Sequence, residues 1–270
     1  MTLPQHATPA VQTKVSHSRR RWQLHLLTDH MQKGAVCLDG SAAGLYHMKG
    51  VGADRSRWLV HFSGGGWCSS VRGCAERAKG ALGSSRSWPD DYPHLDGGQH
   101  GLMSPDPDIA PSTAGWHKVF IMYCDGSSFT GDVEDPIAYN GTLLYFRGAR
   151  VRAAVLDTLV ELGLGSATDV IVKGCSAGAV AAVAAAAPFA RRLPGRVRLA
   201  PDGGVFLDHP PYAPPGQPAG PSPHAALLRA VYELHNATGG VLPACAAALG
   251  ASHAWRCLWR PVAMTPGAPR

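Results

Sequence analysis

DVIVKGCSAGAVAAVAAAA, residues 169–187, changes from one local pattern to another within a few positions. Asp169 to Lys173 is rich in β-branched residues and predicts a buried strand, whereas the alanine-rich run from Ala177 predicts a helix. Between them stands Gly174-Cys175-Ser176-Ala177-Gly178, a G-x-S-x-G turn. A sharp strand-to-helix turn of this kind holds its serine in strained backbone angles and exposes the hydroxyl. The stretch therefore predicts a nucleophilic Ser176 at the end of a central strand.

A second glycine-rich segment could supply a backbone N–H donor for the oxyanion that forms when such a serine attacks an ester. The N–H of Ala177 is expected at a helix N-terminus, where the free donor and the helix dipole both favour an oxyanion. A further donor is expected from Gly64-Gly65-Gly66-Trp67, which follows a predicted strand. Either motif alone is weak, and a serine that merely caps the next helix is the simpler alternative. Together and in this order, they predict acyl-ester hydrolysis by a protein of the α/β-hydrolase class.

The remaining pattern predicts one α/β domain over residues 23–260, with a disordered arm before it (1–22) and a tail after it (261–270). Short apolar runs alternate with helical stretches, which indicates a mostly parallel sheet with helices on both faces. A proline-rich stretch cannot supply ladder N–H groups and predicts an irregular loop. The expected elements are strands at 58–62, 118–123 and 169–173, helices at 145–164, 177–187 and 223–235, and the loop at 210–223.

Composition and charge exclude some classes of function. Hydrophobic residues make up 45% of the 270-residue chain and charged residues 16%, which is globular, and no apolar stretch is long enough for a membrane span. The formal net charge of +6 would suit a polyanionic partner. However, the basic runs at 19–21 and 191–198 have no aromatic residues interleaved with them, so we predict no nucleic-acid binding.

Five blocks stand in a fixed order along the chain: 35–41 (AVCLDGS), 64–68 (GGGWC), 123–132 (YCDGSSFTGD), 174–178 (GCSAG) and 202–208 (DGGVFLD). Together they resemble the plant pectin acetylesterase family, whose animal relative is the carboxylesterase Notum. The resemblance implies a secreted Ser-Asp-His esterase that removes O-acetyl groups from cell-wall pectin, with no cofactor and no metal. We expect a monomer whose partner is acetylated pectin or a related polysaccharide.

The motifs and the resemblance together define the expected site. Loops that follow the carboxyl ends of parallel strands gather around substrate, so the segment 123–132 is expected in the pocket wall. Trp67 could also be a core aromatic, and both interpretations can hold because its expected catalytic role uses only the main chain. The expected site residues are Ser176 as nucleophile, Gly66, Trp67 and Ala177 as oxyanion donors, and Gly65, Asp125 and Ser127 in the substrate pocket.

The acid and the histidine that should activate Ser176 are not evident in the sequence. The family carries its acid after a late strand and its histidine after the final strand, and neither block is found here. His209, beside Asp208, is the least unsuitable substitute, although a loop histidine without a catalytic role is the simpler interpretation. We therefore expect a C-terminally truncated domain that lacks the last strands. The alternative to an active esterase is an inactive family member or a polysaccharide-binding fragment.

Seven cysteines indicate disulfides formed in an oxidising compartment, with at least one thiol left over. The polar N-terminal segment, however, lacks the apolar core of a signal peptide. Without a C-x-x-C pair, a structural zinc site is not expected. Cys175 is expected to be the free thiol, buried in its turn. The suggested pairs are Cys68 with Cys74 from their proximity, Cys245 with Cys257 from the resemblance, and Cys37 with Cys124 as a third.

Overall fold

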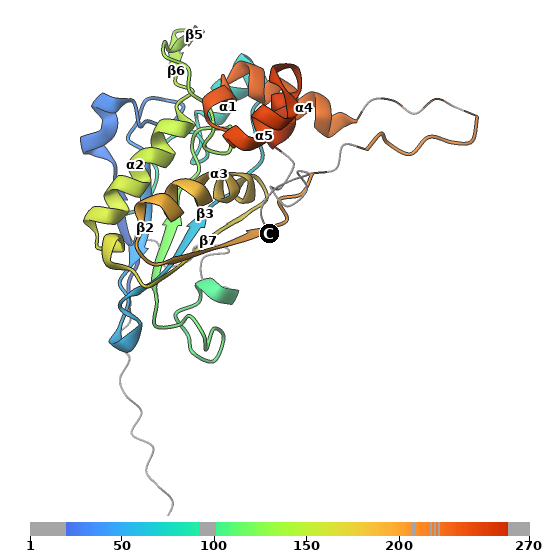
Figure 1. Cartoon of the computed structure of the whole chain (residues 1–270). Coiled ribbons are helices and arrows are strands. Elements are labelled where there is room, and N and C mark those ends of the chain that lie inside the picture. Colours follow the sequence, from blue (N-terminus) through green and yellow to red (C-terminus); the bar gives the residue numbers. More distant parts are fainter. Residues whose placement is uncertain are drawn as a thin grey trace, which may run out of the picture.

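A computed structural model describes residues 20–91, 101–206, 209–216, 218, 220 and 222–258. Within these residues, six strands form one mixed sheet in the order β1-β2-β4-β3-β7-β8. β2 runs antiparallel to both of its neighbours, whereas β4, β3, β7 and β8 are mutually parallel (Figure 1). The strands are β1 (Gln23–Leu26), β2 (Gly44–Met48), β3 (Arg57–Phe62), β4 (His117–Ile121), β7 (Asp169–Cys175) and β8 (Arg196–Asp202).

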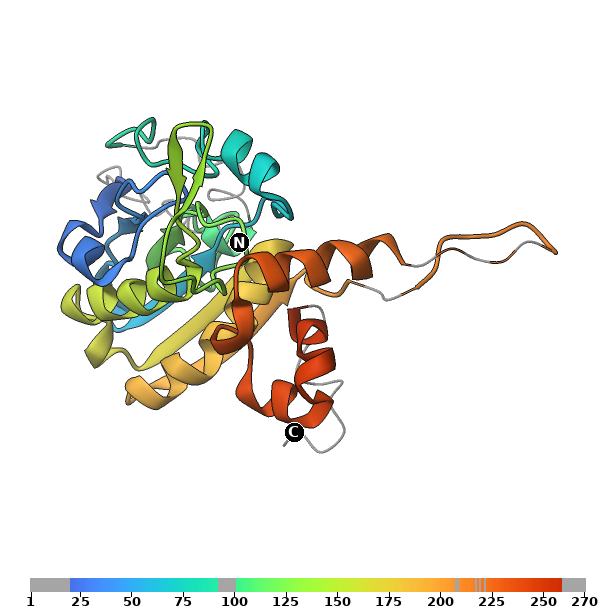
Figure 2. The ribbon, with the colours of Figure 1, turned by 90° about the horizontal axis from the view of Figure 1, so that it is seen from above.

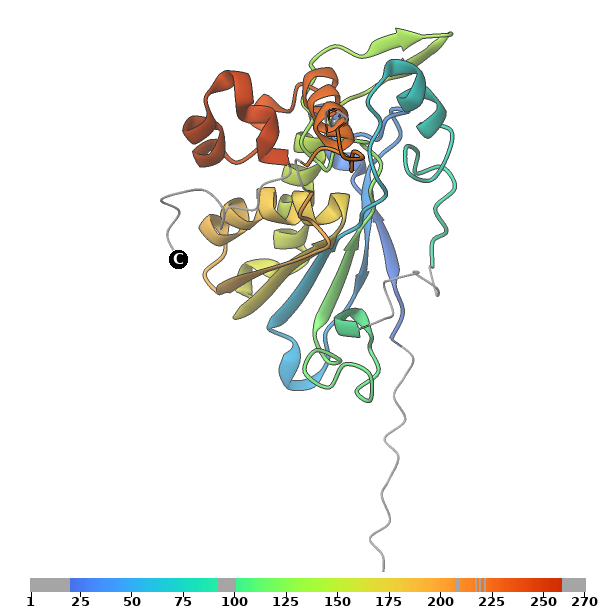
Figure 3. The same ribbon diagram turned by 90° about the vertical axis from the view of Figure 1, so that its right-hand side faces the viewer.

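Two long helices, α2 (Gly148–Glu161) and α3 (Ala177–Arg192), lie on one face of this sheet (Figure 3). They bury apolar side chains against alternate residues of the central strands, such as Val60 of β3 and Val172 of β7. The opposite face of β2, β3 and β4 is covered by other apolar side chains, including Met103 and Trp116. Successive residues of a strand point to opposite faces of the sheet. Because both faces are covered here, the central strands are apolar on both sides.

Smaller elements lie above the carboxyl ends of the parallel strands (Figure 1). α4, α5 and η6 pack on one another and on Val180 of α3. The segment 209–216 extends away from the domain before α4 begins (Figure 2). The remaining elements, some of which lie elsewhere on the sheet, are α1 (Val71–Arg77), β5 (Ile137–Tyr139), β6 (Thr142–Leu144), α4 (Pro223–Leu234), α5 (Pro243–Leu249), and the 3-10 helices η1 (Thr28–Lys33), η2 (Gly52–Asp54), η3 (Gly101–Met103), η4 (Leu164–Ser166), η5 (Ala237–Gly239) and η6 (Ala251–Leu258).

The predicted fold class is confirmed, and each predicted strand and helix is present with shifted ends. The predicted arm reaches too far, because residues 20–22 belong to the fold. Trp22 is 3% exposed, and the Arg20 guanidinium donates to the carbonyls of Lys49 and Trp116. Residues 1–19, the rest of the predicted arm, and 261–270, the predicted tail, lie outside the described residues.

No helix within the described residues has the length and apolar character needed to cross a membrane.

Three disulfides connect the predicted pairs, Cys37–Cys124, Cys68–Cys74 and Cys245–Cys257. The first joins the chain ahead of β2 to the end of β4, across 87 residues of sequence. The second closes a short loop between the end of β3 and α1, and the third joins α5 to η6. All three predicted pairings are therefore confirmed.

Buried histidines give a prediction for stability against pH. Burial lowers the pKa of His47 and His61 to about 3, and that of His235 to about 4, from an ordinary value of 6.5. As pH falls below 6.5, these histidines become protonated in the unfolded chain but stay neutral in the folded chain. The folded state therefore loses stability until the pH reaches the pKa values of the folded state. We expect the free energy of unfolding to fall by up to about 1.4 kcal/mol per pH unit for each of these histidines.

Urea unfolding at a series of pH values from 7 to 5 measures this slope. His61 is a suitable probe, since it is 6% exposed and its Nδ1 has no hydrogen-bond partner within the described residues. A His61→Leu variant should show a shallower loss of stability with acid. An unfolding free energy that stays constant over this range in the wild type would contradict the account.

Candidate active site

Ser176 stands between β7 and α3, where the chain turns from strand to helix. Its backbone angles, φ 56° and ψ −123°, lie in a region that residues with side chains rarely adopt. The Ser176 N–H donates to the carbonyl of Asp202 at the end of β8 (2.9 Å), which ties the turn to the neighbouring strand. The serine is half-buried, and its Oγ makes no hydrogen bond within the described residues. Its backbone is that of a nucleophile elbow.

The glycines of the G-x-S-x-G turn are required by close packing. A Cβ on Gly178 would lie 2.1 Å from the carbonyl oxygen of Phe62, at the end of β3. A Cβ on Gly174 would lie 2.0 Å from the carbonyl oxygen of Gly178 itself. Both distances are much shorter than a van der Waals contact. The first turn of α3 therefore rests directly on the end of β3, where the second glycine-rich segment begins.

Gly64, Gly65, Gly66 and Trp67, here called the glycine loop, lie against the elbow. A Cβ on Gly64 would stand 2.3 Å from the carbonyl oxygen of Cys175 and 3.4 Å from the backbone nitrogen of Ala177. Gly65 and Gly66 then have φ values of +145° and +66°, which favour glycine. The sequence folds in this way because no residue with a side chain could approach the elbow so closely. The glycine loop and the start of α3 thus come together beside Ser176.

Both segments carry backbone N–H groups that have no acceptor within the described residues. Ala177 is the first residue of α3, so its N–H has no acceptor within the helix. The N–H groups of Gly66 and Trp67 donate to no acceptor in the described part of the chain. The side chain of Trp67 has its own contacts, because its Nε1 donates to Ser128 Oγ (2.7 Å) and its ring packs on Phe206. That Gly66, Trp67 and Ala177 stabilise an oxyanion remains a prediction.

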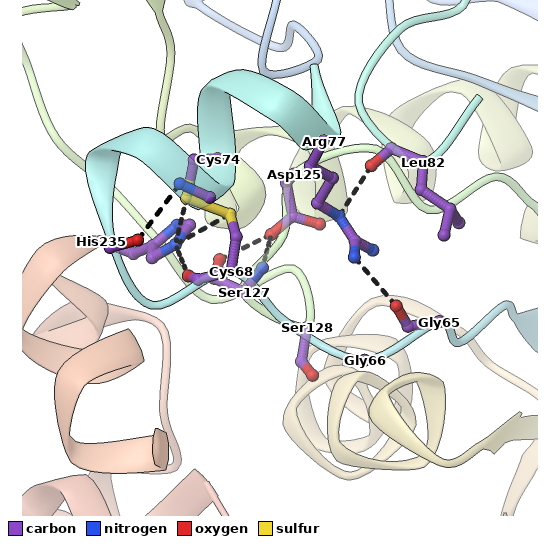
Figure 4. Close-up of a disulfide and its surroundings, with 12 residues drawn as sticks. Gly65, Gly66, Cys68, Cys74, Arg77, Leu82, Asp125, Ser127, Ser128 and His235 are labelled. Atoms are coloured by element: carbon purple, nitrogen blue, oxygen red, sulfur yellow. Dashed lines mark hydrogen bonds between the residues drawn. A yellow bond between two sulfur atoms is a disulfide. The ribbon is translucent and has the colours of Figure 1, made fainter. Parts of the chain in front are cut away.

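The structure corrects the places expected for Asp125 and Ser127, whose side chains are 0% exposed and so cannot line a pocket. Asp125 Oδ2 accepts from the Ser127 hydroxyl (2.6 Å) and from the N–H groups of Ser127 and Phe129 (both 3.0 Å) (Figure 4). Burial raises the pKa of the Asp125 carboxyl, while these hydrogen bonds oppose the rise. Arg152, whose pKa burial lowers to about 10, supplies a nearby positive charge. These groups hold the loop from within, whereas Gly65 is exposed beside the elbow.

The histidines that follow Ser176 make no hydrogen bond to it within the described residues. His209, considered above as a substitute base, is exposed, and its Nδ1 lies 2.6 Å from the carbonyl oxygen of Pro210. Asp208 lies outside the described residues. His224 and His253 are exposed on α4 and η6, and His235 is buried. Among the residues that the structure describes, no histidine is therefore hydrogen-bonded to Ser176 as a base.

One group of residues in the described part of the chain has the spacing of metal ligands. The Cys68 and Cys74 sulfurs and a His235 ring nitrogen lie within 4.8 Å of one another (Figure 4). Cys68 and Cys74 form a disulfide, so neither offers the thiolate that a metal would bind. His235 Nε2 instead lies 2.9 Å from the Cys68 carbonyl oxygen, a hydrogen bond that requires the nitrogen to donate. The group is a disulfide packed against a histidine.

Cys175 is the free cysteine, as predicted, but the expectation that it is buried is wrong, because the residue is exposed. The next strand, β8, pairs with β7 as far as Cys175 and is itself exposed along much of its length. Two side-chain contacts with the glycine loop were not predicted, although one of them comes from the first residue of the block 123–132. Arg77, at the end of α1, and Tyr123, just after β4, both contact carbonyls of the glycine loop. Neither contact has a signal in the sequence, since α1 itself was not predicted.

The chain is similar in sequence to known proteins. A family model described as Pectinacetylesterase matches residues 15–258. Pectin acetylesterase 5 of Arabidopsis thaliana is 40% identical over 190 residues, covering 70% of this chain and 43% of that protein. Palmitoleoyl-protein carboxylesterase NOTUM of Drosophila melanogaster is 30% identical over 190 residues, covering 66% of this chain and 27% of that protein. The chain thus spans less than half the length of these curated relatives.

A solved structure gives the same result for the fold. The Wnt deacylase Notum from Drosophila superposes with a TM-score of 0.74 and 26% sequence identity. The superposition covers 89% of this chain and 67% of the Notum chain. The chain therefore shares the fold of that structure over most of its length.

Proposed function

We propose that this chain, which belongs to the pectinacetylesterase family, carries the nucleophile and the oxyanion hole of a serine esterase. The observation that supports this most is the contact between the elbow and the glycine loop. Ser176 has the strained backbone of a nucleophile, and Gly64 lies against the residues on either side of it. Such strain is costly and persists where the surrounding structure requires it, which is typical of active sites.

In this proposal, Ser176 Oγ attacks the carbonyl carbon of an acetyl ester, and negative charge develops on the carbonyl oxygen. The N–H groups of Gly66, Trp67 and Ala177 stabilise that charge, and the sugar leaves as its hydroxyl with the proton that a base has taken from Ser176 Oγ. Water then hydrolyses the acetyl-serine, which releases acetate and restores the serine. A serine hydroxyl also needs a base to accept its proton. Because no histidine contacts Ser176 in the described residues, added imidazole is the suitable external base for assays.

The proposed substrate is acetylated pectin. The names of the curated plant relatives support it, and a net charge of +6 would attract a polygalacturonate chain. The three disulfides support secretion to the cell wall, where disulfides persist. We further propose that the protein acts as a monomer. An inactive or merely polysaccharide-binding protein has less support, since neither role requires a strained serine beside free N–H groups.

Acetate release from acetylated polygalacturonan tests this function. With imidazole present, the wild type should release acetate about tenfold or more faster than Ser176→Ala, because only the wild type forms an acyl intermediate. Acetylated xylan, a neutral chain, is the matched substrate and should react more slowly. Equal rates for the wild type and Ser176→Ala on polygalacturonan would contradict the proposal.

A further inference from the structure

Two side chains outside the proposed catalytic group hold carbonyl oxygens of the glycine loop. Arg77 Nη1 donates to the carbonyl of Gly65 (2.9 Å), as Figure 4 shows. The Tyr123 hydroxyl donates to the carbonyl of Gly66 (2.8 Å). Consecutive peptide units of the loop are thus each fixed by a side chain from a different element, one from α1 and one from the end of β4.

Because the peptide unit is planar, these contacts also orient the N–H groups of the proposed oxyanion hole. In a trans peptide unit, the C=O and the following N–H lie in one plane and point in opposite directions. A bond to the Gly65 carbonyl therefore sets the direction of the Gly66 N–H, and a bond to the Gly66 carbonyl sets that of the Trp67 N–H. Both of these N–H groups lack an acceptor in the described residues. Glycine backbone has little steric restraint of its own, so the direction depends on the bonds.

Both holding side chains are themselves fixed. Tyr123 is 1% exposed, and its hydroxyl also accepts from the Ser128 N–H (2.9 Å). Burial raises the pKa of Tyr123, so the hydroxyl keeps its proton and can donate to Gly66. Arg77 Nε donates to the carbonyl of Leu82 (3.0 Å), and its guanidinium lies 4.9 Å from the centre of the Tyr123 ring. The two side chains therefore support each other through a cation–π contact.

We infer that Arg77 and Tyr123 are positioning residues for the oxyanion hole. Neither residue touches the acetyl group; each acts through the peptide unit that it holds. The inference rests on the proposed function. It predicts that losing either side chain weakens stabilisation of the transition state and leaves ester binding intact. The signature is a lower maximal rate of Ser176 acylation at an unchanged half-saturating ester concentration.

The experiment measures acetyl transfer from p-nitrophenyl acetate to Ser176 by mass spectrometry, with imidazole present and the ester concentration varied. Tyr123→Phe removes one oxygen and should lower the maximal rate by about 10- to 100-fold. This effect should not exceed that of removing an oxyanion-hole donor itself, because the Trp67 N–H remains and only loses its orientation. Tyr46→Phe is the matched control, because Tyr46 is also buried and its hydroxyl donates to a backbone carbonyl, that of Pro89. That variant should acylate at the wild-type rate.

Arg77 provides an independent arm should Tyr123→Phe fold poorly. Arg77→Met should lower the maximal rate, and Arg77→Lys, which can still donate to the Gly65 carbonyl, should restore part of it. Wild-type rates in Tyr123→Phe and Arg77→Met would overturn the inference, as would a change confined to the half-saturating concentration. If wild-type Ser176 is not acetylated at all, the proposed function fails first, and this inference fails with it.

Discussion

Gly64→Ala should lower the rate of Ser176 acetylation by about 100-fold or more, because it separates the glycine loop from the elbow. The added Cβ would meet the carbonyl oxygen of Cys175 at 2.3 Å, where only backbone could move to relieve the contact. The displacement shifts the donors of Gly66 and Trp67 away from that of Ala177. Overpacking of this kind also costs about 1–3 kcal/mol of stability. Mass spectrometry of the acetylated protein and urea unfolding measure the two effects.

Gly239→Ala is the matched control, since a Cβ there meets nothing within 4 Å and the backbone needs no unusual φ. It should keep the wild-type rate of acetylation and the wild-type stability. If Gly64→Ala acetylates Ser176 as fast as Gly239→Ala does, the close contact between loop and elbow has no part in the chemistry.

Loss of the Cys37–Cys124 disulfide should destabilise the fold more than loss of either other disulfide. The bond spans 87 residues. Closing so long a loop lowers the conformational entropy of the unfolded chain, which raises its free energy by about 4–5 kcal/mol. Both cysteines are buried next to the central strands, so replacing them also leaves unfilled space. The double variant Cys37→Ala/Cys124→Ala should therefore unfold at a much lower urea concentration.

The double variant Cys68→Ala/Cys74→Ala offers the comparison, because its cysteines are only 6 residues apart. The shorter loop predicts a loss of about 2 kcal/mol. Equal losses in the two double variants would show that loop length does not determine the effect. Unfolding has to be followed without reductant, so that the remaining disulfides stay closed.

The elbow could be predicted from the sequence because its causes are local. The strand, the glycines and the alanine-rich helix are contiguous, and each has a strong preference for the structure it adopts. Gly174 illustrates this, since a Cβ there would lie 2.0 Å from the carbonyl oxygen of Gly178, which belongs to the same turn. The central sheet was predictable for the same reason, because β3 and β7 are short apolar runs rich in β-branched and aromatic residues.

The interior of the site could not be predicted, because it depends on tertiary contacts. Asp125 follows the end of β4, but its side chain is buried against the start of α2, where a Cβ on Gly148 would lie 2.2 Å from Asp125 Oδ2. Cys175 is exposed even though it pairs with Asp202 of β8, and the sequence of the turn does not specify this exposure. The contacts of Arg77 and Tyr123 with the glycine loop join residues that are distant in sequence. No local sequence pattern predicts such long-range contacts.

The location of the acetyl group after reaction with p-nitrophenyl acetate tests the central claim, that Ser176 is a nucleophile facing an oxyanion hole. Because the exposed thiol of Cys175 is adjacent and could also react, the comparison is made in a Cys175→Ala background, with and without Ser176→Ala. The account predicts one acetyl group per chain, on Ser176, formed only by the folded protein and absent from the Ser176→Ala variant. Acetyl groups spread over surface lysines, at the same rate with and without Ser176, would contradict it.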